Sequence, residues 1–433
     1  MRYVFLVSLA CLVCSIANSA GLQSAELRAE LLYGYSTAAS STLEAGLELE
    51  PAFEYRFGDT SRLVFSARLR WDAEDHLAPG KPDVETYDGA SRPWTVGSNA
   101  VAEMRDAYLQ IDLPRGLLRI GKQQIAWGAL DGLKIMDSLN PQNFREFILE
   151  DFADSRIGLW SVYADVTRGN WRAELAWIPD TTGHEIPAPG AWFELVAPRF
   201  RYGAEPDAPR PPTTTIRPDS TIDDATIGVR IARLLGGWDL GLVAISGYDF
   251  EPLGRLVSSP TGPVLERYHA RRELLGISAG TSLGAVAMRA EVSYRPERMF
   301  NLRDGTELVS EPLDQYSVGL GIDISGPFDT FINLQYVLDH VQSAPDTLVR
   351  PRTDRLVTLL LRRNFAYDTV TTELRWYRDA GKGDELLRAA LAYVIGEETS
   401  LRLGLDVFRG DADGLFGQFN DRDRITLSVE HYF

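Results

Sequence analysis

The sequence contains very little cysteine. Its two cysteines, Cys11 and Cys14, both lie within residues 1–20. We predict that this stretch is a secretory signal peptide, because Arg2 precedes a short apolar run that ends in small residues. Residues 21–433 contain no cysteine, which excludes disulfides, thiol chemistry and cysteine-ligated metal in the exported chain. Backbone pairing and burial must hold that chain together.

Long apolar runs, excess positive charge and catalytic motifs are also missing. After the signal peptide no run approaches the roughly 18 apolar residues of a membrane helix. The 61 acidic and 44 basic residues give a net charge of −17, so nucleic acid is not an expected partner. None of the five histidines lies in a Gly-x-Ser-x-Gly or His-Glu-x-x-His frame. We therefore predict no enzyme, cofactor or metal site.

What the chain does contain is a strict alternation of apolar and polar residues. In residues 42–57, Leu43 and Leu47 stand on one face and Glu44 and Glu48 on the other, as in a strand with one oily and one wet side. Eighteen such stretches recur, each about the ten residues of a tilted transmembrane strand. We place them at 25–35, 42–57, 61–72, 101–113, 116–125, 156–167, 170–179, 223–234, 237–249, 271–281, 284–295, 314–324, 328–340, 354–363, 367–378, 384–395, 399–409 and 423–433.

The connections between these stretches alternate in length. Short turns such as 58–60 and 114–116 separate long connections such as 73–100, 126–155 and 296–313. Short turns on one side and long loops on the other are typical of outer-membrane barrels. The sequence therefore predicts an all-β fold, a transmembrane antiparallel up-and-down barrel of about 18 strands. A soluble β-sandwich is the alternative, because soluble strands alternate too.

The predicted barrel implies a location and surroundings. The last strand ends in Phe433, which resembles the C-terminal signal that the barrel-assembly machinery recognises for insertion. We expect the cell outer membrane of a Gram-negative bacterium, with membrane lipid and lipopolysaccharide as neighbours.

The inward faces of the predicted strands carry charges of both signs. Barrels of about sixteen to eighteen strands enclose water, and charges that face water are far less costly than charges that face lipid. The predicted lumen-wall residues are Arg68, Arg70, Arg289, Glu291, Glu373 and Arg375. They either simply solvate the lumen or form a ladder for ions or solutes.

The connection at residues 126–155 breaks the alternation. Asn140 and Pro141 predict a helix start, because Asn caps and Pro tolerates the first helical position. A connection this long is usually functional or disordered, and this one is too apolar for disorder. We predict that it folds inward, packs on the wall and narrows or plugs the lumen. The constriction or gating candidates are Asp131, Asp137, Arg145, Glu146, Glu150, Asp151, Asp154 and Arg156. A helix that caps the loop side without affecting permeation is the alternative.

Residues 118–160, which begin LRIGKQQIAWGALDG, resemble a signature of a poorly characterised family of proteobacterial outer-membrane barrels. The signature residues include Gly121, Gln123, Gln124, Trp127, Gly128, Asn140 and Pro141. The stretch LRIGKQQ is also similar, more distantly, to a strand motif of the alginate-export porins. Family members often accompany RND-type exporters and lipoprotein-sorting-like proteins. The resemblance therefore implies transport, with an exporter or periplasmic carrier as a partner.

The favoured function is an outer-membrane channel or transport barrel that moves a solute across the outer membrane, for example as the outer-membrane component of an export system. The alternative is a non-conducting barrel that serves as a docking or assembly partner for periplasmic lipid-handling proteins. That alternative gains weight if residues 126–155 plug the lumen.

Overall fold

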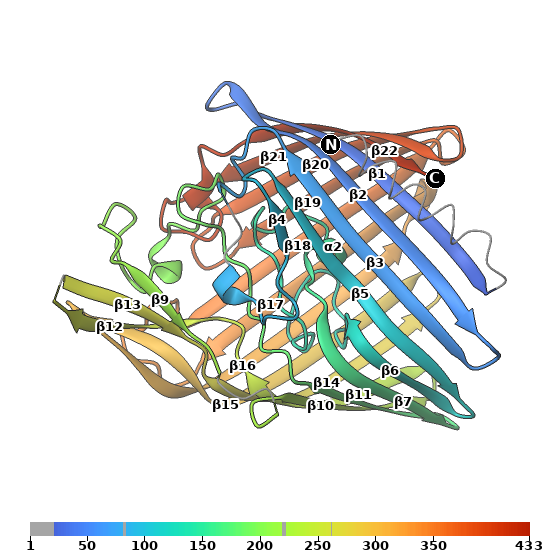
Figure 1. The fold of residues 1–433 in the computed structure, drawn as a ribbon, viewed down its shortest axis with the longest axis horizontal. Coiled ribbons are helices and arrows are strands. Elements are labelled where there is room, and N and C mark those ends of the chain that lie inside the picture. Colours follow the sequence, from blue (N-terminus) through green and yellow to red (C-terminus); the bar gives the residue numbers. More distant parts are fainter. Residues whose placement is uncertain (1–20, 81–83, 219–221, 261) are drawn as a thin grey trace.

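The computed structural model describes residues 21–80, 84–218, 222–260 and 262–433. The signal peptide predicted at residues 1–20 lies outside this part of the chain. Tilted strands wrap around a central space, and irregular segments lie within it (Figure 1). A small second sheet of three strands projects from the long-loop end.

Eighteen of the strands in the described residues form the barrel. They are β1 (Leu22–Ser36), β2 (Ser41–Phe57), β3 (Ser61–Asp72), β5 (Ala100–Leu113), β6 (Gly116–Gln123), β7 (Leu159–Arg168), β8 (Trp171–Ile178), β10 (Thr226–Leu235), β11 (Trp238–Tyr248), β14 (Arg271–Leu283), β15 (Val286–Asp304), β16 (Glu307–Ser325), β17 (Thr330–Val341), β18 (Thr353–Phe365), β19 (Val370–Asp379), β20 (Glu385–Ile395), β21 (Thr399–Arg409) and β22 (Arg424–Tyr432). Neighbouring strands pair antiparallel, and β1 pairs with β22 to close the barrel. The predicted fold class is confirmed, and each predicted stretch overlaps one of these strands.

The remaining elements are short. They are η1 (Val84–Thr86), β4 (Trp94–Val96), α2 (Phe152–Ser155), η2 (Pro198–Phe200), β9 (Thr213–Ile216), β12 (Leu253–Ser259), β13 (Gly262–Tyr268), η3 (Pro327–Asp329) and η4 (Gly417–Phe419). The strand β4 extends the main sheet beside β5, whereas β9, β12 and β13 form the separate sheet. None of the helices in the described ranges has the length and apolar character needed to cross a membrane.

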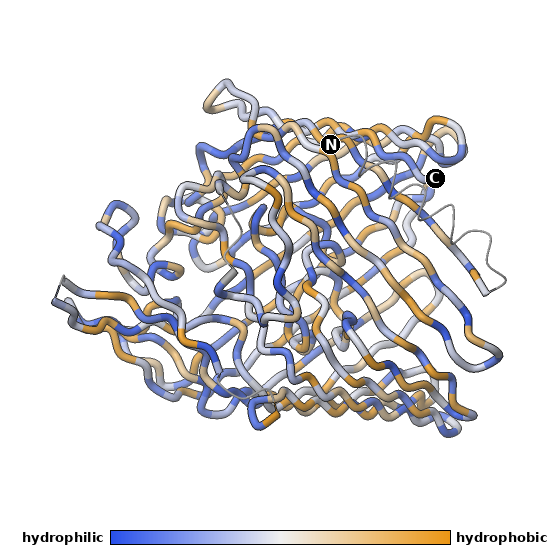
Figure 2. Tube along the Cα trace, viewed as in Figure 1, coloured by the Kyte–Doolittle hydropathy of each residue, from blue (hydrophilic) through white to orange (hydrophobic). Residues whose placement is uncertain are grey.

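The outer surface of the barrel is apolar. Side chains alternate along each strand, so orange and blue positions follow one another in Figure 2. The outward residues Leu175, Ile231 and Leu242 are 49%, 42% and 56% exposed. Trp171 and Trp238 stand beside the short turns and are also exposed, where interfacial aromatics stabilise a barrel in lipid. Phe433 lies at the same end, 70% exposed, and its role in insertion stays a prediction.

Four connections that we predicted to be loops contain strands, and two of them, 73–100 and 180–222, contain the short strands β4 and β9. The prediction was wrong for residues 296–313, because β15 and β16 continue to pair as far as Asp304 and Glu307. The ladder shifts register between Arg295 and Arg298, so Pro296 falls in a bulge, where its missing N–H breaks no ladder bond. The connection between β11 and β14 likewise holds the β12–β13 hairpin.

Leu43 does not face lipid as the alternation predicted. The register between β1 and β2 shifts between Gly34 and Tyr35, which leaves Leu43 as an extra residue on β2. The bulge reverses the alternation locally. Leu43 is 1% exposed and belongs to the buried cluster around Phe147 and Phe416.

Replacing Gly121 should impair assembly of the barrel. Gly121 has a φ of +136°, and an added Cβ would lie 2.7 Å from the Cα of Tyr108 on β5. We expect Gly121→Ala to lose about 1–3 kcal/mol through backbone strain and to lower the folded fraction in a heat-modifiable gel-shift assay. Gly280→Ala is the matched control, because there the nearest atom, the oxygen of Met288, is 3.8 Å away. Equal folded fractions in the two variants would contradict the strain argument.

Candidate functional site: the lumen and its inner segment

The connection between β6 and β7, residues 124–158, lies along the inner wall of the barrel, and we call it the inner segment. Its apolar side chains join those of four wall strands and the β11–β14 connection in one buried cluster. The members are Ile125, Trp127, Leu130, Ile135, Met136 and Leu139 of the inner segment, with Leu159, Tyr163, Ala176, Ile178, Val243, Ile245, Phe250 and Leu274. The inner segment therefore packs its apolar face on the wall of the barrel.

Glycines on the inward wall make room for these side chains. An added Cβ on Gly276 of β14 would lie 2.8 Å from the sulfur of Met136. One on Gly319 of β16 would overlap the side chains of Leu130 and Ile135. Sequence reasoning missed these wall glycines. The sequence did contain a signal for them, because a glycine at an inward position of a strand often marks the close approach of another chain segment.

The helix that we predicted to begin at Asn140 is wrong, because α2 begins only at Phe152. The buried Asn140 side chain instead joins the two ends of the inner segment. Its oxygen accepts a hydrogen bond from the N–H of Ile125 (2.8 Å), and its amide donates to the carbonyls of Gln123 (3.3 Å) and Ile157 (2.8 Å). A side chain that serves three backbone groups is not available as a helix cap.

Asn140→Ala should loosen the inner segment. The variant leaves one buried N–H and two carbonyls without this partner, and each buried unsatisfied group costs about 1–3 kcal/mol. We expect faster cleavage within residues 124–158 in limited proteolysis of the folded barrel. Asn140→Asp keeps the acceptor and loses the donors. Its cleavage rate should therefore lie between those of the wild-type chain and the Asn140→Ala variant. Cleavage at the wild-type rate in the alanine variant would contradict this role.

The middle of the inner segment is bound to the wall strands β15 and β17. Glu291 of β15 is fully buried and accepts backbone N–H bonds from Ala129 and Met136, the latter at 3.3 Å. Gln335 of β17 accepts from the N–H of Asp131 (3.0 Å) and donates to its carbonyl (2.8 Å). The Asp131 carboxylate pairs with Arg289 at 3.1 Å. Inside the barrel the segment thus reaches from β6 along the wall to β15 and β17.

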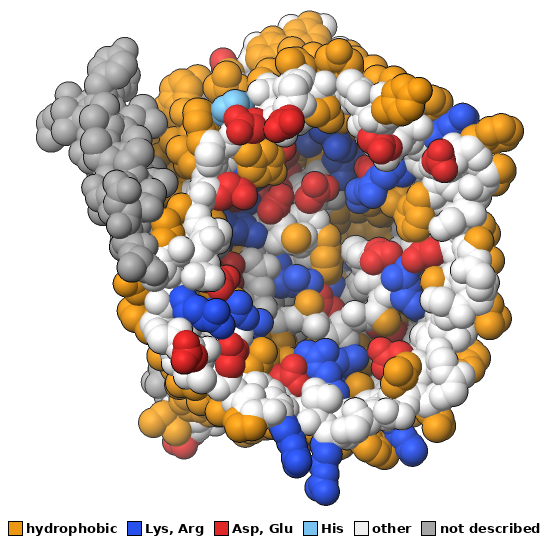
Figure 3. Space-filling view, turned by 90° about the vertical axis from the view of Figure 1, so that its right-hand side faces the viewer, with side chains coloured by type: hydrophobic (Ala, Val, Ile, Leu, Met, Phe, Trp, Pro, Cys, Tyr) orange, Lys and Arg blue, Asp and Glu red, His pale blue; other side chains and the backbone are white. Residues whose placement is uncertain are grey.

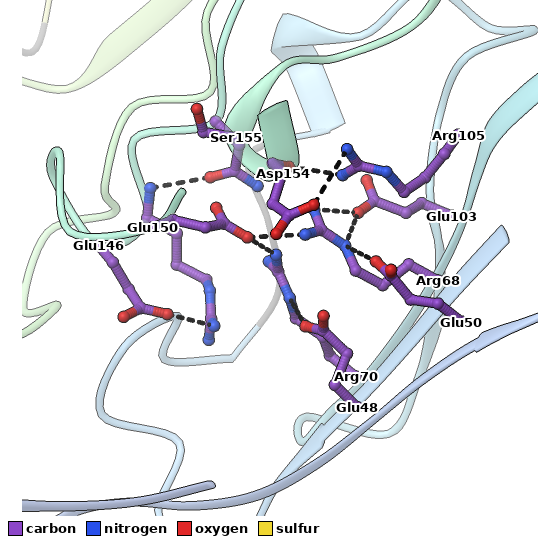
Figure 4. A network of polar contacts seen from close by, with 12 residues as sticks. Glu48, Glu50, Arg68, Arg70, Glu103, Arg105, Glu146, Glu150, Asp154 and Ser155 are labelled. Carbon is purple, nitrogen blue, oxygen red and sulfur yellow. Dashed lines mark hydrogen bonds and ion pairs between the residues drawn. The ribbon is translucent and has the colours of Figure 1, made fainter. Parts of the chain in front are cut away.

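Most of the predicted constriction carboxylates meet arginines. Figure 4 shows Glu150 of the inner segment facing Arg68 and Arg70 of β3. Glu150 binds Arg68 at 2.7 Å and also contacts Arg70. Arg68 in turn binds Glu103 of β5, and Arg70 binds Glu48 of β2 at 2.9 Å. These carboxylates hold the segment to the wall, so they do not project as a free acidic ring.

Three further pairs complete these contacts. Arg156 binds Asp137 at 2.5 Å. Glu146 binds Arg424 of β22 at 2.9 Å and Arg145 at 2.8 Å. Burial alone would raise the pKa of Glu146, but the two guanidinium groups outweigh burial and hold that pKa below its ordinary value.

Some predicted residues lie apart from these pairs. Asp151 is exposed beside α2, and Asp154 lies 3.9 Å from Arg105. The wall pair Glu373 and Arg375, 2.6 Å apart, lies on β19. Sequence reasoning missed Glu103 and Arg424 as partners. Alternation could have placed both on the inward face, but it does not say which carboxylate each charge meets.

The signature residues gather where β6 enters the inner segment. Gln123 donates to the carbonyl of Ser161 (3.3 Å), and Gln124 follows it in the chain. Trp127 is 2% exposed, and its backbone N–H donates to the carboxylate of Asp137 at 3.3 Å. An added Cβ on Gly128 would lie 2.9 Å from the Cβ of Asp137, and the carbonyl of Pro141 accepts from Ile157 (2.9 Å). The signature residues position the inner segment.

The short-turn end of the barrel is hollow. Figure 3 shows an open mouth at this end, lined by acidic and basic side chains, with apolar side chains on the outer rim. A buried apolar cluster lies at the long-loop end. Its members are Leu43, Leu77, Phe147, Leu149, Phe193, Leu386, Phe408, Phe416 and Phe419. Within the described ranges, no group of three His, Cys, Asp or Glu side chains is arranged to hold a metal ion.

Comparisons with known proteins identify a family and a fold. Residues 95–350 match the model of a family described as "Protein of unknown function (DUF1302)". No curated protein matches the sequence. Among solved structures the chain is similar to OccAB3 of Acinetobacter baumannii, with 9% identity and a TM-score of 0.52 over 94% of this chain and 98% of that one. It is also similar to OpdK of Pseudomonas aeruginosa with vanillate, with 12% identity and a TM-score of 0.51 over 95% and 99%.

The likeness to these structures shows the fold alone, and the fold is a porin-like barrel over nearly the whole chain. The family match includes residues 118–160, on which the sequence resemblance depends. The association with exporters and lipoprotein-sorting-like proteins and the likeness to alginate-export porins stay predictions.

Proposed function

The chain belongs to the DUF1302 family of proteins of unknown function, and from that premise we propose that it is an outer-membrane channel for small hydrophilic solutes. One observation carries the proposal. A closed barrel of eighteen strands is apolar outside and presents a hollow with charged walls inside. A wall of that kind suits water and polar solutes, because a barrel of this size is too wide for its own wall side chains to fill.

The outer belt supports a location in the outer membrane of a Gram-negative bacterium. Residues such as Leu242 and Ile277 are more than half exposed on successive strands, and a continuous apolar surface of this kind is stable only when lipid covers it.

The inner segment sets the cross-section in this proposal. It is held by ion pairs to β3 and β22 and by hydrogen bonds to β15 and β17. A segment anchored at several points on the wall narrows the passage. Residues 126–155 are therefore the size filter of the channel.

A second function is favoured by one specific observation. The aromatic cluster around Phe193, Phe408 and Phe419 fills the long-loop end with buried side chains. A barrel closed there would be a docking or assembly partner for periplasmic lipid-handling proteins. The export role, with a periplasmic carrier or exporter as partner, extends the channel proposal and is supported by the resemblance of residues 118–160.

The test is single-channel recording of the refolded exported chain in planar bilayers, together with swelling of proteoliposomes in sugars of increasing size. A channel should give steady conductance, with swelling that stops above a size limit. A gel shift on heating confirms that the barrel is folded. Folded protein that stays silent, and whose variant without the inner segment is also silent, would overturn the channel proposal and leave the docking function.

A further inference from the structure

A cavity of about 230 Å³ lies between the inner segment and the wall. Ile135 and Ser138 of the inner segment line one side, and Phe250 and Val337 line others. The volume is below the roughly 300–1,000 Å³ of pockets that enclose drug-sized ligands. The cavity therefore suits a small solute with its water.

Positive side chains outnumber negative ones in the lining. The cations are Lys134, Arg272, Arg295, Arg298 and Arg350, and the carboxylates are Asp137, Asp249, Glu251 and Asp339. The carboxylates are already in ion pairs. These pairs are Arg298 with Asp249 (2.5 Å) and Glu251 (2.8 Å), Arg350 with Asp339 (2.8 Å), and Arg156 with Asp137 (2.5 Å). Because Arg298 serves two of these carboxylates, the lining as a whole has five cations against four carboxylates. Lys134, Arg272 and Arg295 are the cations that have no carboxylate closer than 3.9 Å.

These three cations bind carbonyls of the inner segment. Arg295 donates to the carbonyl of Ile135 (2.8 Å), Arg272 to that of Ser138 (2.7 Å), and Lys134 to that of Asn140 (2.9 Å). Within the described residues, neither Lys134 nor Arg295 forms a salt bridge with a carboxylate. Arg272 approaches Asp249, which Arg298 already binds, only at 3.9 Å.

The charge on these side chains is poorly compensated. Arg272 and Arg295 are 6% and 7% exposed, and a buried charge without a counter-charge is unfavourable. Neutral carbonyls satisfy hydrogen bonds but leave the net positive charge. An anion in the cavity would supply the missing counter-charge through charge-assisted hydrogen bonds.

We propose that this cavity is a binding site for a small organic anion, a monocarboxylate with an apolar body, with the carboxylate on Arg295, Arg272 and Lys134. Phe250 and Val337 offer apolar surface to the rest of the molecule. Cations line the cavity on both the inner segment and the wall, so an anion there lies beside the filter. That the anion passes through the barrel rests on the proposed channel function, whereas its binding does not.

Lys134 makes the site sensitive to pH. Burial lowers the pKa of Lys134 to about 7, although Asp137 opposes the shift. The other charged groups facing it are Arg156 and Arg272. His184, also in the lining, stays neutral because burial lowers its pKa to about 3. Affinity should therefore fall as the pH rises from 6 to 8.5 and Lys134 loses its proton.

The experiment measures benzoate binding to the refolded exported chain in detergent micelles by titration calorimetry, with neutral benzamide as the shape control. We expect saturable benzoate binding and none with benzamide. Arg295→Gln should weaken binding at least tenfold, Arg295→Lys less, and Lys134→Met should remove the pH dependence. Arg375→Gln is the matched control, because that wall arginine lies on β19 outside the cavity. The affinity of this variant for benzoate should equal that of the wild-type chain.

The outcomes separate the two proposals. Equal binding of benzoate and benzamide, or equal loss in the Arg295 and Arg375 variants, would overturn the anion site whether or not the barrel conducts. If Arg295→Gln does not fold, loss of the pH dependence in Lys134→Met still tests the site. Benzoate binding to a barrel that never conducts would overturn the channel and leave the anion site standing.

Discussion

Deleting residues 130–152 and joining the ends with a short Gly-Ser linker is expected to raise single-channel conductance several-fold. The deletion removes Glu150 and Glu146, which fasten the inner segment to β3 and β22. It also removes the apolar side chains that lie over Gly276 and Gly319. Because the strands pair with one another and not with this segment, the barrel should still close. Its cross-section should then be set by the strand number.

Planar-bilayer recording at the same salt concentration measures this effect. A matched control shortens the β12–β13 hairpin, which projects beyond the barrel (Figure 1), and its conductance should equal that of the intact chain. A silent intact chain with a conducting deletion variant would mean that the inner segment plugs the barrel. Equal conductance in the intact chain and the folded deletion variant would show that the segment does not limit passage.

Glu291→Ala is expected to release the middle of the inner segment while leaving the barrel folded. Glu291 is fully buried, and its carboxylate accepts the backbone N–H groups of Ala129 and Met136. Hydrogen bonds to a charged group contribute about 1.5–3 kcal/mol each. For each amide, the loss of its one bond at about 2 kcal/mol changes the local opening equilibrium by a factor of up to about 30. The rate of amide hydrogen exchange at Ala129 and Met136 should therefore rise by up to about 30-fold.

Two variants test whether the effect belongs to the backbone contacts. Glu291→Gln keeps one acceptor oxygen without the charge, so its exchange should lie between wild type and alanine. Glu373→Ala removes another largely buried wall carboxylate, but Glu373 binds Arg375 and Arg362 on the wall. It should leave exchange in the inner segment unchanged. Equal acceleration in the Glu291→Ala and Glu373→Ala variants would point to a general loss of stability.

The eighteen strands were predictable because the signal for each is local. A residue pair such as Leu47 and Glu48 reports its two faces without reference to any other part of the chain. The short turns were predictable for the same reason. The sequence also showed that residues 126–155 differ from the strands, since their composition is apolar and does not alternate.

The site itself depends on contacts between residues far apart in the chain. Glu146 meets Arg424 across 278 positions, and Ala129 meets Glu291 across 162. No local pattern encodes which inward charges face each other once the sheet has closed. For the same reason Asn140 looked like a helix cap, although it ties Ile125 to Ile157.

The sequence by itself therefore determined the eighteen barrel strands, the two faces of their regular stretches and the presence of an inserted segment. Only the tertiary structure decided the path of that segment, the arginines that hold it and the cations left without a carboxylate. The physical reason is the range of the interactions involved. Alternation along a strand acts between neighbouring residues, whereas burial and ion pairing inside the barrel act only after closure brings distant strands together.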